Sequence, residues 1–144
     1  MLVADASAVV AALLNARARS VLDGDLQVHA PHLMDSEVAS AVRTRVRRGK
    51  LDGRAGWDLL EHYRRLGITR HSTFPMYDRI WELRNNLSAY DAAYVALAET
   101  LDCPLLTGDA ASVEPPACAA RLHYSRVDEL LPQMLRQRRL RRSK

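Results

Sequence analysis

The segment LSAYDAAYVAL, residues 87–97, predicts the start of a strong helix. Ser88 is a good N-cap, and Asp91 falls three residues later, where its carboxylate can return a hydrogen bond to the cap. Ala92, Val95, Ala96 and Leu97 follow as an apolar face at helical spacing. The helix dipole favours an acid in the first turn by up to about 1 kcal/mol, so Asp91 taken alone is more readily a capping residue than a catalytic one.

Length and composition indicate one globular domain. The chain has 144 residues, 48% of them apolar and 26% charged, which is typical of a folded protein rather than a disordered one. No apolar run approaches the roughly 18–20 residues that cross a membrane. The chain begins directly with Leu2-Val3-Ala4-Asp5, without a basic leader, and Cys103 and Cys118 form no CxxC pair. These features predict a cytoplasmic protein with reduced thiols.

The net charge of +4 is unevenly distributed. Residues 136–144 hold six cations and no acid, which leaves 15 basic against 17 acidic residues in the rest of the chain. We therefore predict a domain over residues 1–135 and a basic tail over 136–144. A second basic run, residues 43–50, includes Arg43 and Arg47. Such runs are usually solvated, and contact with RNA phosphates is the alternative interpretation for both.

Strand and helix patterns alternate along the chain. Helical patterns cover residues 7–14, 16–23, 53–66, 75–85, 88–101 and 127–135, and a further helix, capped by Asp35 or Ser36, ends at Gly49. Strand patterns cover residues 2–4, 26–30, 68–71, 104–107 and 121–124. This alternation predicts a three-layer α/β/α fold with a mostly parallel sheet.

Four acids map to one edge of that sheet. Asp5 follows the first strand, Glu37 lies in the helix after the second, and Asp109 follows the strand at 104–107. The helix that begins at Ser88 runs antiparallel to the strand it feeds, so its first turn, with Asp91, returns to the same edge. Asp5 and Asp109 can each be simple turn residues and Glu37 an ordinary first-turn acid, but their joint arrival at one edge favours a site.

Clustered carboxylates call for a cation. Two like charges 4 Å apart repel by about 4 kcal/mol at an effective dielectric of 20. Oxygen ligands without His or Cys suit Mg²⁺ or Mn²⁺, and such sites cleave phosphodiesters. No Gly-rich phosphate loop and no HExxH motif is present in the sequence. The pattern predicts metal-dependent hydrolysis of phosphodiesters.

The same residues resemble the PIN-domain superfamily, and within it the VapC toxins of bacterial toxin–antitoxin pairs. The matching segments, in the family's order and spacing over residues 1–135, are LVADAS (2–7), SEV (36–38), LSAYDAAYVALA (87–98) and LLTGD (105–109). The resemblance implies a five-stranded sheet in the order 3-2-1-4-5. It also implies an endoribonuclease that uses Mg²⁺ or Mn²⁺, and a water rather than a side chain as nucleophile, leaving 5′-phosphate and 3′-hydroxyl ends.

The resemblance also assigns roles and partners. By residue matching, Asp5, Asp91 and Asp109 hold the metal, Glu37 completes the catalytic acids, and Ser7 and Thr107 support them through their hydroxyls. The implied partners are an RNA substrate and a VapB-type antitoxin, with a homodimer that forms a heterotetramer or a larger complex with the antitoxin. A catalytically silent PIN-like module that binds RNA or protein is the competing hypothesis.

Overall fold

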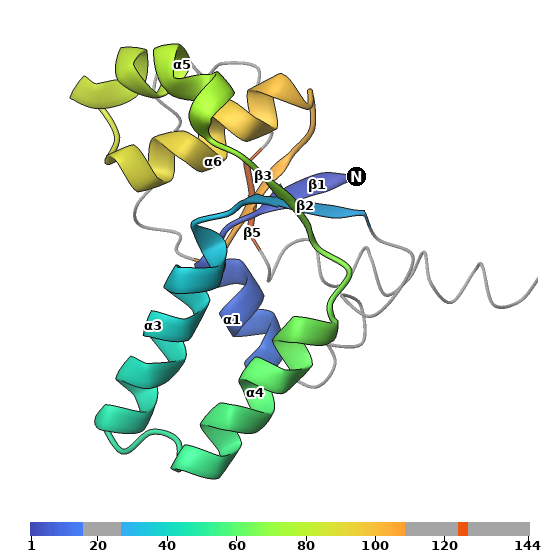
Figure 1. Cartoon of the computed structure of the whole chain (residues 1–144), viewed down its shortest axis with the longest axis vertical. Helices are drawn as coiled ribbons and strands as arrows, with labels where there is room; N and C mark the ends of the chain where they lie inside the picture. Colours follow the sequence, from blue (N-terminus) through green and yellow to red (C-terminus); the bar gives the residue numbers. More distant parts are fainter. Residues whose placement is uncertain (16–26, 109–123, 127–144) are drawn as a thin grey trace, which may run out of the picture.

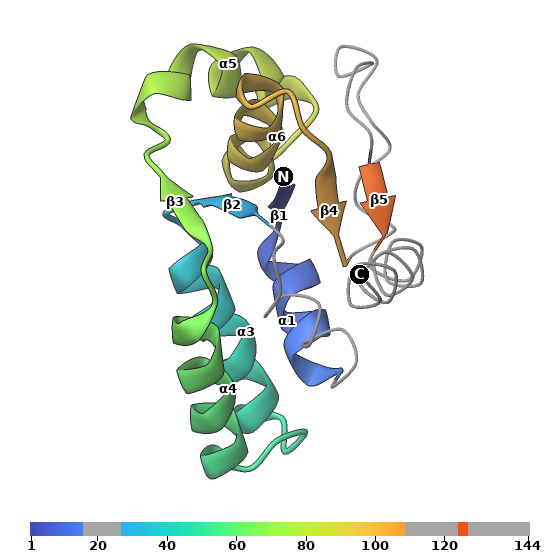
Figure 2. The same ribbon diagram turned by 90° about the vertical axis from the view of Figure 1, so that its right-hand side faces the viewer.

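Five short strands form one sheet in the order β3-β2-β1-β4-β5 (Figure 2), in which every neighbouring pair is parallel. The computed structural model describes residues 1–15, 27–108 and 124–126. The strands are β1 (Leu2–Ala4), β2 (Val28–Pro31), β3 (Thr69–His71), β4 (Leu105–Thr107) and β5 (Tyr124–Arg126). This confirms the five-stranded parallel sheet and its order.

Helices cover both faces of the sheet. The helices α1 (Ala6–Leu14), α3 (Met34–Arg47) and α4 (Gly53–Arg65) lie on one side, and α5 (Tyr77–Glu82) and α6 (Ala89–Thr100) lie on the other (Figure 1). Short 3-10 turns flank α5, namely η1 (Phe74–Met76) and η2 (Leu83–Asn85). The three-layer α/β/α architecture is therefore confirmed. Among the described residues no helix is long and apolar enough to cross a membrane.

The core runs through the middle of the sheet. Val3, Ala4 and Ala30 are fully buried, as expected for central strands of a parallel sheet that is covered on both faces. Every residue of α6 from Ala92 to Ala98 is also buried. The apolar face expected for this helix is thus confirmed, and it is wider than its spacing suggested, because α6 packs across β1, β2 and β4.

Local signals place most helix ends correctly. Ser88 caps α6, since its hydroxyl oxygen accepts a hydrogen bond from the Asp91 N–H. Gly49 follows α3 with φ of +66°, and the N–H groups of Gly49 and Lys50 bond back to the carbonyls of Val46 and Arg45. These two hydrogen bonds form a Schellman cap, which needs one residue in the left-handed backbone conformation; glycine adopts that conformation without strain.

Two expectations about helices are wrong. Neither Asp35 nor Ser36 caps α3, which begins one residue before Asp35 and has no side-chain cap. The Asp35 carboxylate is instead bonded to Tyr63 and Arg70, which outcompete the local backbone. The single helix expected over 75–85 is divided into η1, α5 and η2, because Met76, at φ −104° and ψ 8°, leaves helical geometry.

The end of the chain is described only at β5. This strand spans Tyr124–Arg126 rather than the expected 121–124. The expected helices over 16–23 and 127–135, the basic tail over 136–144, and Asp109 and Cys118 all lie outside the described residues.

Candidate active site

Asp5 stands at the junction between β1 and α1. It is the N-cap of α1, and its Oδ1 accepts hydrogen bonds from the Ala8 N–H and from the Ser7 hydroxyl, each 2.7 Å long. A strand that stops at an acid followed by a helix start therefore gives a carboxylate with a fixed orientation. The Asp5 carboxylate is held at the carboxyl end of the central strand of the sheet.

Ser7 connects this carboxylate to the end of β4. Its Oγ accepts a 2.9 Å hydrogen bond from the Gly108 N–H, although 101 residues separate the two in sequence. Gly108 approaches so closely that a Cβ at this position would lie 2.8 Å from the Ser7 carbonyl carbon and oxygen. The next residue, Asp109, is outside the described residues, but this contact fixes where the chain leaves β4. Thr107, also expected to support the site, is buried.

Glu37 comes from the first turn of α3 and is half-buried. Its Oε2 accepts a 2.5 Å hydrogen bond from the hydroxyl of Tyr94, which projects from α6 on the other side of the sheet. The Tyr94 ring is buried in the core. Its hydroxyl has a second role that was missed, although its place three residues after Asp91 was a usable signal.

Asp91 is the third residue of α6 and is exposed. The Ser88 hydroxyl donates a 2.7 Å hydrogen bond to Oδ2 of Asp91, while the Asp91 N–H donates back to the Ser88 Oγ at 3.1 Å. The return bond expected between Asp91 and the cap is therefore present. It uses one carboxylate oxygen and leaves the other without a hydrogen-bond partner in the part of the chain that the structure describes.

The three acids influence one another electrostatically. Burial raises the pKa of Glu37, and the negative charges of Asp5 and Asp91 raise it further, while the Tyr94 hydrogen bond works in the opposite direction; the net shift is upward. Within residues 1–15 and 27–108, none of the three forms an ion pair with Lys, Arg or His. Asp5, Glu37 and Asp91 thus gather negative charge that no side chain in these ranges neutralises.

The donor chemistry of this site fits a hard divalent cation. All the side-chain atoms that could bind a metal are carboxylate or hydroxyl oxygens, which Mg²⁺ and Mn²⁺ prefer. Burial first, and then the charges of Asp5 and Asp91, raise the pKa of Glu37, and a cation would offset those charges. Within the described ranges, no three His, Cys, Asp or Glu side chains are grouped closely enough to form a metal-binding set by themselves. A complete set would therefore need water, substrate oxygens or a residue beyond Gly108.

Arg43 and Arg47 are not brought to the acids. Both are exposed on α3, roughly 9 and 15 Å further along the helix axis than Glu37 at 1.5 Å per residue. The hairpin of α3 and α4 projects away from the sheet (Figure 1). Any role of these arginines would be at a distance from the carboxylates.

Comparison with known proteins identifies the family of this chain. Residues 2–113 match the model of the PIN domain. VapC ribonuclease Mb0985 of Mycobacterium bovis is 50% identical over 110 residues, covering 76% of this chain and 86% of that protein. Ribonuclease VapC1 of Mycobacterium tuberculosis is 39% identical over 132 residues, covering 86% and 97%. The chain belongs to the PIN-domain family. Within that family it is of the VapC type, which confirms the resemblance found in the sequence.

Solved structures agree at the level of the fold. The crystal structure of PAE2754 from Pyrobaculum aerophilum superposes with a TM-score of 0.69 at 21% identity, over 93% of this chain and 94% of that one. FitAcB from Neisseria gonorrhoeae superposes with a TM-score of 0.59 at 19% identity, over 90% and 100%. At these identities the likeness supports the architecture alone.

Proposed function

We propose that the chain is a Mg²⁺- or Mn²⁺-dependent endoribonuclease and the toxin of a toxin–antitoxin pair. The observation that carries this proposal is the half-buried Glu37, which is close enough to Asp5 and Asp91 to be affected by their negative charges. No Lys, Arg or His side chain among the described residues forms an ion pair with it. The ribonuclease names of the VapC relatives supply the substrate class. A VapB-type antitoxin, a homodimer and larger assemblies with the antitoxin are the partners that the same relationship suggests.

In this proposal Asp5, Asp91 and Asp109 hold the metal. The bound cation supplies Lewis-acid chemistry, lowering the pKa of a water and stabilising charge on the phosphate oxygens. Ser7 and the Ala8 N–H fix the Asp5 carboxylate, and Ser88 fixes one oxygen of Asp91. The raised pKa of Glu37 suits its remaining oxygen, Oε1, to accept a proton from the attacking water, while Tyr94 holds Oε2.

The substrate chain would extend from this site toward the α3–α4 hairpin. Arg43 and Arg47 are exposed there and are proposed to contact RNA phosphates several nucleotides away from the scissile bond. Their contribution would be to affinity and would weaken as salt concentration rises, because it depends on release of counterions from the phosphates.

The test compares two helix caps. Asp5 and Asp52 each cap a helix and accept a 2.7 Å hydrogen bond from the N–H three residues later. Asp5→Asn and Asp52→Asn therefore make the same change at two comparable caps: each removes a negative charge and keeps an oxygen that can accept the capping hydrogen bond. We expect Asp5→Asn to lower Mg²⁺-dependent RNA cleavage by at least about 100-fold and Asp52→Asn to leave it unchanged. Cleavage of a labelled RNA, with and without EDTA, measures both.

Metal binding provides a second readout that does not require turnover. Mg²⁺ at 100 times its Kd should stabilise the folded protein by about 2.7 kcal/mol, and Asp5→Asn should remove most of this stabilisation. Cleavage that survives EDTA or Asp5→Asn would contradict the proposal. A folded, metal-binding chain that binds RNA without cutting it would instead support the silent binding module.

A further inference from the structure

Two histidines from neighbouring strands, β2 and β3, face each other. Nδ1 of His29 lies 2.9 Å from Nε2 of His71, and the centres of the two rings are 5.2 Å apart. A hydrogen bond between two ring nitrogens needs a lone pair on one of them, so at least one ring is neutral. Both residues are partly exposed, so an ion from solvent can reach them. The pair has no role in the proposed catalysis.

The register of the sheet fixes this pair. His71 lies opposite Pro31 in the parallel pairing of β2 with β3, and His29 stands two residues before Pro31. Since side chains two residues apart in a strand point to the same face, the two imidazoles are diagonal neighbours on one face of the sheet. Arg70 points to the opposite face, where it contacts residues of α3 and α4. The strands therefore hold both rings in place before any ligand binds.

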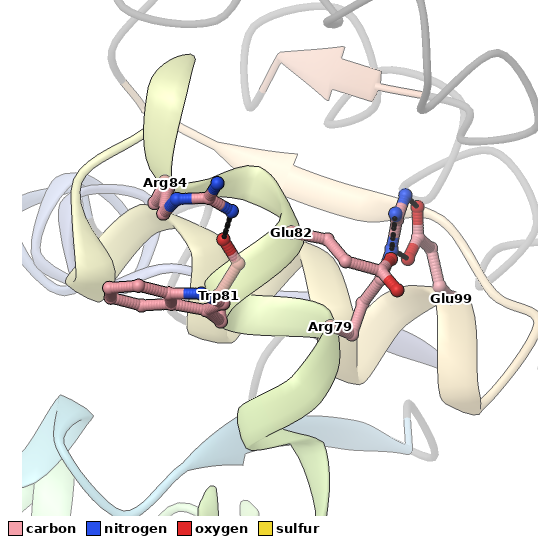
Figure 3. Close-up of polar contacts among 5 residues, drawn as sticks. All are labelled: Arg79, Trp81, Glu82, Arg84 and Glu99. Atoms are coloured by element: carbon pink, nitrogen blue, oxygen red, sulfur yellow. Dashed lines mark hydrogen bonds and ion pairs between the residues drawn. The ribbon is translucent and has the colours of Figure 1, made fainter.

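The histidine pair differs from the ion-pair clusters of the molecule, one of which is shown in Figure 3. Arg79 of α5 donates hydrogen bonds to both carboxylate oxygens of Glu99 on α6, at 2.6 and 2.8 Å, and to Glu82 at 2.8 Å. A guanidinium has no lone pair to offer a metal, and its positive charge offsets that of the carboxylates. A neutral imidazole, in contrast, carries no charge and has a nitrogen lone pair that binds metals. Of the two clusters, only the histidine pair can take a cation.

The separation of the two nitrogens fits two ligands of one transition-metal ion. With Zn–N bonds of about 2.0–2.1 Å, two nitrogen ligands lie about 2.9 Å apart at a right angle and about 3.3 Å apart at the tetrahedral angle. The observed 2.9 Å is at the lower end of this range. To bind an ion, the ring that donates the hydrogen bond moves its proton to its other nitrogen, which frees the second lone pair. Over residues 1–15 and 27–108 no group of three His, Cys, Asp or Glu side chains could hold a metal, so water would fill the remaining positions.

We propose that His29 and His71 form a site for Zn²⁺ or another ion that prefers imidazole ligands, such as Ni²⁺ or Cu²⁺. Its chemistry differs from that of the carboxylate site, because Mg²⁺ and Mn²⁺ prefer oxygen ligands. A bound ion would link β2 to β3, which is an edge strand of the sheet. The inference goes beyond the proposed nuclease function and does not depend on it.

The first experiment titrates Zn²⁺ into the metal-free, full-length chain near neutral pH. The Kd from isothermal titration calorimetry should rise at least about 10-fold in His29→Gln and in His71→Gln, because either change leaves a single imidazole. His32→Gln is the matched control and should leave the Kd unchanged, since His32 is exposed directly after β2 and its charge acts on Asp35. Circular dichroism verifies that each variant is folded.

Nuclear magnetic resonance identifies the ligand atoms without any substitution. In ¹⁵N-labelled wild-type protein, saturating Zn²⁺ should shift the signals of His29 Nδ1 and His71 Nε2. The same shifts should occur in Asp5→Asn, in which the carboxylate site is altered, so a failure here is separate from a failure of the ribonuclease proposal. A Zn²⁺ affinity that is unchanged in both histidine variants would overturn the inference. So would a spectrum in which neither ring shifts, which would leave the pair as a hydrogen bond between two strands.

Discussion

Two carboxylates in the first turn of α3, only two residues apart, have opposite environments. Asp35 and Glu37 each accept a hydrogen bond from a tyrosine hydroxyl, Asp35 from Tyr63 at 2.6 Å and Glu37 from Tyr94 at 2.5 Å. Arg70 then completes the first cluster, with its Nη2 2.9 Å from the Asp35 carboxylate and its guanidinium over the Tyr63 ring. Glu37 has no such cation, and its charged neighbours are Asp5 and Asp91.

The pKa shifts follow this difference. Partial burial raises the pKa of Asp35, but the hydrogen bonds from Tyr63 and Arg70 and the charge of Arg70 outweigh it, so the pKa lies below its ordinary value. For Glu37, burial and two negative neighbours outweigh one hydrogen bond, and the pKa lies above its ordinary value. In the Asp35 cluster, the charge of Arg70 balances that of the carboxylate, and the pair stabilises the fold. The Glu37 cluster keeps an excess of negative charge, to which a cation could bind.

The largest expected effect is on catalysis. Glu37→Gln keeps the size of the side chain and an oxygen for the Tyr94 hydroxyl, but it removes a charge and a proton acceptor. We expect RNA cleavage to fall by about 100-fold or more, while Asp35→Asn keeps wild-type cleavage. Single-turnover rates at saturating Mg²⁺ measure the difference. Equal losses in the two variants would mean that the clusters are not functionally distinct.

A smaller effect of opposite sign is expected on stability. Arg70→Met leaves Asp35 and Tyr63 without their cation and should lower the free energy of unfolding by about 1–2 kcal/mol. Glu37→Gln should raise it by up to about 1 kcal/mol in metal-free protein, because repulsion with Asp5 and Asp91 is relieved. Urea denaturation in EDTA measures both changes.

An exposed ion pair serves as the control for Arg70→Met. Arg64 pairs with Glu61 one turn away and its side chain is 71% exposed, so Arg64→Met should change the free energy of unfolding by less than about 0.5 kcal/mol. A destabilised Glu37→Gln protein would show that the site acids contribute to folding rather than oppose it.

The sequence predicted those features that depend on neighbouring residues. Ser88 capped its helix and Gly49 ended α3, because each signal acts within one turn of the chain. The order of the sheet, which the family resemblance implied, was also correct. The edge shared by Asp5, Glu37 and Asp91 follows from the alternation of strands and helices, because the carboxyl ends of parallel strands lie at one edge.

Contacts between distant segments were not predictable. Asp35 was expected to cap α3, but Tyr63 and Arg70, 28 and 35 residues away, determine its role. The Tyr94 hydroxyl reaches Glu37 across 57 residues. Its place three residues after Asp91 indicates a shared helix face, but it does not indicate that Glu37 is the partner. Periodicity identifies which face of a helix is buried, but it does not reveal which polar atom a buried ring presents to a partner from another element.

The smallest expected effect is a difference in pH dependence. The folded-state pKa of Asp35 lies below its unfolded value near 3.8, so its stabilising contribution is present above pH 3.8 and is lost as pH falls through the folded-state pKa. The folded-state pKa of Glu37 lies above its unfolded value near 4.5, so the folded protein binds the proton first and gains stability as pH falls toward 4.5.

Comparing each variant with wild type isolates these two slopes. In metal-free protein, the difference in the free energy of unfolding between wild type and Glu37→Gln should move in favour of wild type as pH falls from 7 toward 4.5. The difference between wild type and Asp35→Asn should move against wild type below about pH 3.8. Each slope is limited to about 1.4 kcal/mol per pH unit, since one proton is involved. If the two differences moved in the same direction, the two acids would not have opposite environments, and the case for a cation at Glu37 would lose its electrostatic basis.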